Sequence, residues 1–90
     1  MSVKVRIHPL LQEFTGGQEV AEVSGRNVGE CLDHLEIQFP GIKRGLCDKR
    51  GKVLNYLEIY INSESSYPEE LTKSVNDGDE LTIVILVGGG

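Results

Sequence analysis

The chain has 90 residues, 39% hydrophobic and 26% charged, which fits one small globular domain with a single core. Fourteen acidic and nine basic residues give a net charge of −5, which argues against nucleic acid as the main partner because phosphate binding requires clustered positive charge. No apolar run approaches the ~20 residues that cross a membrane, and the first residues lack the apolar core of a signal peptide. We therefore expect a cytoplasmic protein with no membrane partner.

The first third of the chain predicts two antiparallel strands. Val3, Val5 and Ile7 alternate with polar residues, which is typical of a half-buried strand. The segment Thr15-Gly16-Gly17-Gln18 predicts a turn, and residues 19–23 read as the second strand.

One helix is predicted from Val28 to Phe39. Asn27 is a favourable N-cap, and Glu30 three residues later is typical of a capping box. Apolar residues recur at helical spacing and predict one buried stripe, made of Val28, Leu32, Leu35 and Phe39. Pro40-Gly41 ends the helix.

A long connection follows, from Ile42 to Asn55. A loop of this length in a small domain indicates either a functional insertion or a mobile excursion. Within it, residues 48–52 form the only basic cluster, which we interpret as a solvated turn. Residues 57–61 alternate in hydrophobicity and predict another strand.

The last part of the chain contains the most clearly predicted strand. Residues 64–76 are polar and predict a short strand or a helical turn, with Leu71 and Val75 as anchors. Residues 77–80 are a tight turn signal. Residues 81–87 are nearly apolar, so both faces of this strand should be at least partly covered or used.

This order of elements predicts an α+β fold. A right-handed crossover would make the first and last strands parallel neighbours, with the helix across one face of the sheet. That arrangement is the β-grasp, or ubiquitin-like, roll, with a mixed sheet of four to five strands on one helix. We expect the domain to cover residues 1–87 and the glycines at 88–90 to form a flexible tail that presents its own C-terminal carboxylate.

The cysteines and histidines carry no recognisable site. Cys31 and Cys47 form no Cys-x-x-Cys pair and have no metal-ligand spacing with His8 or His34, so we predict no metal and no iron–sulfur cluster. Cys31 is predicted in the core and Cys47 as a free thiol in a loop. Because no nucleophile–base pair or phosphate-binding loop is present, we do not expect an enzyme in its own right.

The C-terminal motifs resemble those of the MoaD/ThiS family of ubiquitin-like sulfur carriers, and the match covers essentially the whole chain. Asp77-Gly78-Asp79-Glu80, the apolar strand and Gly89-Gly90 are similar to the family's usual ending, and Gly88 fills a position where a small residue such as alanine is common. Three further features are similar to CysO-type carriers, which serve amino-acid biosynthesis: Thr15-Gly16-Gly17-Gln18, the long loop to Asn55, and Ile59-Tyr60-Ile61-Asn62.

The resemblance implies that Gly90 carries the reactive group. A ubiquitin-activating-type enzyme would adenylate its carboxylate with ATP and magnesium, and a sulfur source would then displace AMP to leave a thiocarboxylate. That group would donate sulfur inside a biosynthetic enzyme, a sulfhydrylase or synthase, with cysteine or homocysteine synthesis as the expected pathway. A metallopeptidase would release the product. The carrier itself would hold no permanent cofactor.

Glycine suits the tail because it has no Cβ, so Gly88 and Gly89 can enter a narrow active site. If Leu81 and Ile83 face the core, alternate residues of the same strand face outward beside the first strand. An apolar patch rimmed by charge is typical of a partner site. The predicted docking residues are Val84, Leu86 and Arg6, with Asp79 and Glu80 steering toward a basic partner.

Two alternatives use the same tail. One is a ubiquitin-like protein modifier that is joined to lysines through Gly90. The other is the small subunit of molybdopterin synthase, which would form a stable complex with the large subunit.

Overall fold

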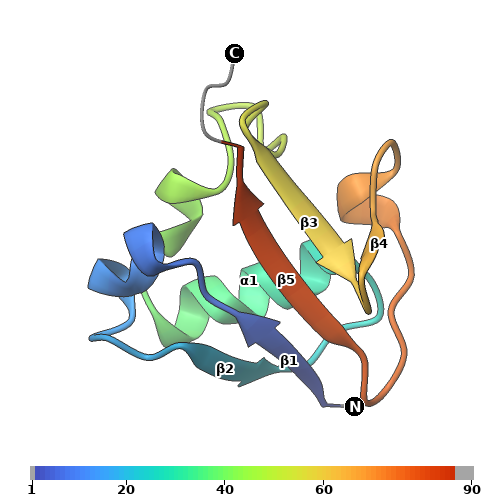
Figure 1. Cartoon of the computed structure of the whole chain (residues 1–90), viewed down its shortest axis with the longest axis horizontal. Coiled ribbons are helices and arrows are strands. Elements are labelled where there is room, and N and C mark those ends of the chain that lie inside the picture. Colours follow the sequence, from blue (N-terminus) through green and yellow to red (C-terminus); the bar gives the residue numbers. More distant parts are fainter. Residues whose placement is uncertain (1, 87–90) are drawn as a thin grey trace.

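The computed structural model describes residues 2–86. Five strands form one sheet in the spatial order β2-β1-β5-β3-β4, and the helix α1 lies across one of its faces (Figure 1). The bounds are β1 Val3–Arg6, β2 Val20–Val23, α1 Val28–Gln38, β3 Leu57–Ile61, β4 Glu64–Ser65 and β5 Glu80–Ile85. Three short 3-10 helices cover Pro9–Phe14, Ile42–Gly45 and Glu70–Thr72.

The last strand is the centre of the sheet. β5 pairs in parallel with β1, with Val5 opposite Leu81, and antiparallel with β3, with Ile59 opposite Ile83. β2 and β4 then lie at the two edges. This mixed five-stranded sheet on one helix confirms the predicted β-grasp fold.

The helix begins as the sequence predicts. The Asn27 side-chain oxygen accepts the N–H of Glu30 at 2.8 Å. The Glu30 carboxylate accepts the N–H of Arg26 at 2.9 Å, one residue before the position that a capping box would use. The helix ends at Gln38, one residue earlier than predicted, and Phe39 is its C-cap.

The core lies between α1 and the inner face of the sheet. The helix contributes the buried residues Val28, Cys31, Leu32 and Leu35, while Phe39 is partly buried against them. The strands contribute alternate residues, with the largest fully buried ones being Val3, Val5, Ile59 and Leu81. Burying each large aliphatic side chain contributes about 1.5–3 kcal/mol, so this layer supplies most of the drive for folding.

The connection between α1 and β3, predicted as either a functional insertion or a mobile excursion, is anchored to the core at both ends of its exposed turn. Ile42 and Leu46 are fully buried, and Cys47 pairs with Val53 in an isolated β-bridge. The Glu36 carboxylate accepts the N–H groups of Gly41 at 2.8 Å and Lys43 at 2.9 Å. The connection is therefore part of the core, because its apolar side chains close the end of the helix–sheet layer.

The polar segment between β3 and β5 holds both of the predicted elements. It contains β4 and the 3-10 helix Glu70–Thr72. Val75 is buried, and Leu71 packs partly buried against the core, so both residues anchor the segment as predicted. Over residues 2–86, no helix is both long and apolar enough to cross a bilayer.

Candidate functional site: the root of the tail and the outer sheet face

The predicted reactive end falls outside the described residues. Gly88, Gly89 and Gly90 lie there, together with Val87, so their roles stay predictions. The last described residue is Leu86, directly after β5. The site that can be examined is therefore the root of the tail and the surfaces around it.

The root is fixed by the centre of the sheet. Leu57 of β3 lies opposite Ile85 of β5, and one residue further on the N–H of Leu86 donates to the carbonyl of Tyr56 at 2.7 Å. The strand itself ends at Ile85, two residues earlier than predicted. β5 is the central strand of the sheet and has a hydrogen-bonded neighbour on each side. The root of the tail is therefore attached to a well-anchored strand.

An apolar groove borders this root. It has a volume of about 320 Å³, and the Leu86 side chain, 49% exposed, is part of its wall. The groove is lined by Val53, Leu54, Asn55, Leu57, Glu58, Tyr67, Glu70 and Leu86. Burial and the nearby Glu58 carboxylate raise the pKa of Glu70 above its usual value.

A second groove runs along the outer face of the sheet and contains two of the predicted docking residues. Its volume is about 350 Å³, and it is lined by Arg6, Ile7, His8, Pro9, Gln12, Glu19, Thr82, Ile83 and Val84. Thr82 and Val84 are partly exposed, whereas Leu81 and Ile83 are buried. The alternation predicted for the last strand is therefore correct, and the structure brings Val84 and Arg6 together.

The two predicted acids lie at the opposite end of β5 from Leu86. Six strand residues separate these ends, which corresponds to roughly 20 Å. The Glu80 carboxylate pairs with Arg6, with Nε and Oε2 3.1 Å apart. The Asp79 carboxylate accepts the side-chain amide of Asn62 at 2.8 Å and the N–H of Asn76 at 2.7 Å. Both acids therefore have partners within the chain. The predicted docking residues do not form one cluster, because the acids and Leu86 lie at opposite ends of β5.

Sequence reasoning missed the aromatic residues beside the tail root. Tyr67 is 70% exposed and lines the groove with Leu86, and Tyr56 is 49% exposed. An aromatic residue in an otherwise polar segment was the available signal for Tyr67. The Tyr56 position needs the pairing of β3 with β5, which only the fold supplies.

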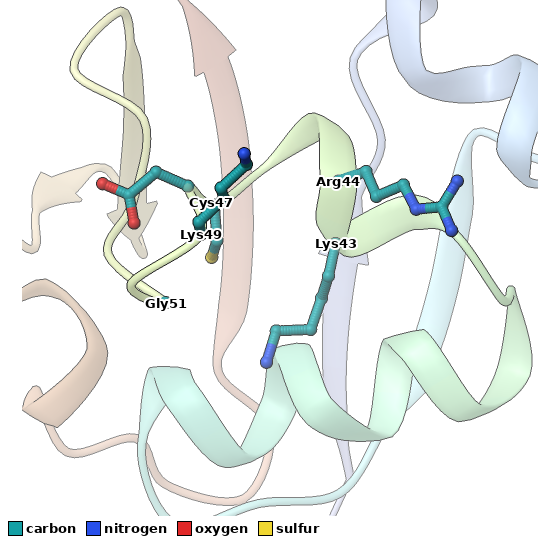
Figure 2. A pocket seen from close by; sticks show the side chains of 6 residues that line it. Lys43, Arg44, Cys47, Lys49 and Gly51 are labelled. Atoms are coloured by element: carbon teal, nitrogen blue, oxygen red, sulfur yellow. The ribbon is translucent and has the colours of Figure 1, made fainter.

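A hollow of about 550 Å³ is lined in part by Cys47, and the labelled basic side chains around it point in different directions (Figure 2). Lys43 turns toward α1, where its Nζ pairs with Asp33 at 2.6 Å, while Arg44 extends in another direction. Burial raises the pKa of the Cys47 thiol, which favours the protonated form over the more nucleophilic thiolate. Among residues 2–86, no group of histidine, cysteine and acidic side chains could hold a metal.

Comparison with known proteins identifies the family. The ThiS family model matches residues 5–90. The sulfur carrier protein CysO of Mycobacterium tuberculosis H37Rv is 36% identical over 93 residues, covering all of both chains.

Solved structures agree with this result. A chain in the crystal structure of the Amycolatopsis orientalis BexX/CysO complex superimposes with a TM-score of 0.89 at 36% identity, over 98% of this chain and 99% of that one. Small archaeal modifier protein 1 of Haloferax volcanii has a TM-score of 0.84 at 24% identity, which shows the shared ubiquitin-like fold. Family members are protein co-substrates and not enzymes. The chain therefore belongs to the ThiS family of ubiquitin-like sulfur carriers, as the terminal motifs predicted.

Proposed function

We propose that this carrier delivers sulfur from a thiocarboxylate on Gly90 to a biosynthetic enzyme, in cysteine or homocysteine synthesis. The observation that carries the proposal is the full-length similarity to CysO, together with a tail root held by the central strand. The alternatives predicted from the same tail differ in what receives the activated glycine.

The proposed cycle has two chemical steps before delivery. The Gly90 carboxylate attacks the α-phosphate of ATP in a ubiquitin-activating-type enzyme, and pyrophosphate leaves. Sulfide (HS⁻) then attacks the acyl carbon and displaces AMP with loss of a proton, so one carboxylate oxygen is replaced by sulfur. ATP and magnesium belong to the activating partner, and the carrier needs no cofactor of its own. We expect the reaction in the cytoplasm, where ATP is available.

In this proposal the folded domain binds the partner enzyme, and the tail carries the group that reacts. Four residues follow Leu86, and a fully extended segment of that length spans at most about 14 Å. Ordering such a segment costs conformational entropy, which docking by the domain must offset. We propose that Leu86 and Val84 provide that docking surface, while Arg6 with its partner Glu80, and Asp79, act toward its far end.

Intact mass spectrometry tests the proposal. The chain is incubated with the activating enzyme of its own organism, ATP, magnesium and a sulfide source. We expect a mass increase equal to the replacement of one oxygen by sulfur. Deletion of Gly90 should abolish the increase while circular dichroism stays unchanged. Normal thiocarboxylate formation by the shortened chain would disprove the role of Gly90.

One structural similarity favours the protein modifier as a second candidate. Small archaeal modifier protein 1 of Methanosarcina acetivorans is 27% identical, with a TM-score of 0.84 over 99% of this chain. Ladders of lysine conjugates without any thiocarboxylate would support the modifier and exclude the carrier. Stable binding to a large molybdopterin synthase subunit would instead support the third candidate.

A further inference from the structure

Positive charge is concentrated in one segment of this acidic protein. Residues 43–52, here called the basic loop, contain five of the nine lysines and arginines and one acid, so the loop carries +4. The other 80 residues contain four bases and thirteen acids, so they carry −9. A charge separation of this size within a small domain produces a strongly directional electrostatic field.

Hydrogen bonds to the side chain and backbone of Asp48 close the turn of the basic loop. The Asp48 carboxylate accepts the N–H groups of Arg50 at 2.8 Å and Lys52 at 3.0 Å, and the N–H of Asp48 donates to the Lys52 carbonyl at 2.8 Å. Leu46 is fully buried beneath it. The only acid of the loop is thus used to hold the turn, and a fixed loop loses little entropy on binding.

The remaining basic side chains are exposed. Lys43 pairs with Asp33, but no ion pair within 4 Å engages the other four among residues 2–86. These four exposed residues, here called the basic surface, are Arg44, Lys49, Arg50 and Lys52. In Figure 2, Arg44 and Lys49 extend in different directions and do not converge on one small anion. Their arrangement suits a broad acidic surface.

The basic loop also lies at the end of the sheet where the tail begins (Figure 1). The N–H of Leu54 donates to the Leu46 carbonyl at 2.9 Å, which connects the loop to the segment entering β3. That segment contains Tyr56, whose carbonyl accepts the N–H of Leu86. Two backbone hydrogen bonds therefore connect the basic loop, through the segment entering β3, to the root of the tail.

We propose that the basic surface docks on an acidic face of the activating enzyme that receives the tail, and this inference rests on the proposed function. A nucleic acid is disfavoured as the occupant, because the −9 carried by the rest of the domain would repel a phosphate backbone. Complementary charge next to the tail would raise the association rate and fix the orientation in which the tail enters.

Charge reversal with a matched control tests this proposal. K49E/R50E is compared with R26E/K73E, which changes the net charge equally but lies outside the basic loop. In thiocarboxylate formation at low salt, K49E/R50E should raise KM for the carrier at least ~10-fold, with kcat within about twofold of wild type. High salt should shrink the difference, because screening weakens exposed charge pairs. Equal KM values for the two variants would overturn the proposal.

A second measurement separates this inference from the proposed function. If the wild-type chain forms no thiocarboxylate, the proposed function fails, and the surface is tested directly by titrating ¹⁵N-labelled protein with a capped pentaglutamate peptide. Amide shifts confined to residues 43–52 and lost in K49E/R50E would support the acidic partner. Absent shifts, or tighter binding of a single-stranded DNA 20-mer by the same residues, would overturn it.

Discussion

The N–H of Leu86 donates to the carbonyl of Tyr56 at 2.7 Å, one residue beyond the last pair of the β3–β5 ladder. This bond fixes the backbone at the root of the tail while the Leu86 side chain stays 49% exposed. The side chain can therefore change without loss of a core contact, and the tail still leaves from the same point.

Leu86→Glu should weaken docking without unfolding the domain. The substitution removes the apolar contact area that Leu86 offers to a partner. It also adds a carboxylate to a groove that already contains Glu58 and Glu70. We expect KM for the activating enzyme to rise about tenfold, a loss of about 1.4 kcal/mol. Ile37→Glu is the control, because Ile37 is 76% exposed on α1. Wild-type kinetics for Leu86→Glu would exclude this docking surface.

Asn62 should stabilise the turn before β5 in two separable ways. Its side chain donates to Asp79 at 2.8 Å and accepts the N–H of Glu80 at 3.0 Å, and its φ is 50°. Asn62→Gly loses the hydrogen bonds but tolerates this φ, whereas Asn62→Ala also carries backbone strain of about 1 kcal/mol. Urea unfolding should therefore rank the two variants below wild type, with alanine lowest. Equal stability of the two variants would contradict this account.

Glu36 should make folding depend on pH. Hydrogen bonds from the N–H groups of Gly41 and Lys43 hold the pKa of its carboxyl below the ordinary 4.5. A lowered folded-state pKa contributes stability that is present above the unfolded value and is lost as the pH falls through the folded one.

The glutamine variant tests this dependence. Glu36→Gln should be less stable than wild type at pH 7, and the difference should shrink at about pH 3. Urea unfolding at both pH values measures it. A constant difference would indicate that the charge of Glu36 contributes nothing.

Both thiols should resist modification in the folded protein. Burial, with a smaller contribution from Glu30, raises the pKa of Cys31 to about 11, and burial raises that of Cys47 as well. Because the thiolate is the reactive form, alkylation at neutral pH should be at least ~100-fold slower than in urea. Fast labelling of Cys47 in the native state would show that its cover opens.

Much of the fold follows from local sequence patterns. The Asn27 cap, the apolar stripe of α1 and the alternation of β3 each depend on residues within a few positions of one another, so the sequence alone predicts them. The acidic turn, the apolar strand and the terminal glycines together likewise predicted the family without coordinates, and the family model confirms it.

Tertiary structure decided how distant segments meet. The connection after α1 packs into the core through the fully buried side chains of Ile42 and Leu46, which no local pattern reveals. Glu80 pairs with Arg6 only because β1 and β5 are parallel neighbours.

Sequence and tertiary structure also contribute differently at the tail. The sequence of the tail determined which atoms are proposed to react. The pairing of β5 with β3 determined what lies beside the tail root, namely the exposed Tyr56, the groove at Leu86 and the basic loop. These neighbours depend on hydrogen bonds between residues about thirty positions apart, and only the folded sheet brings such residues together.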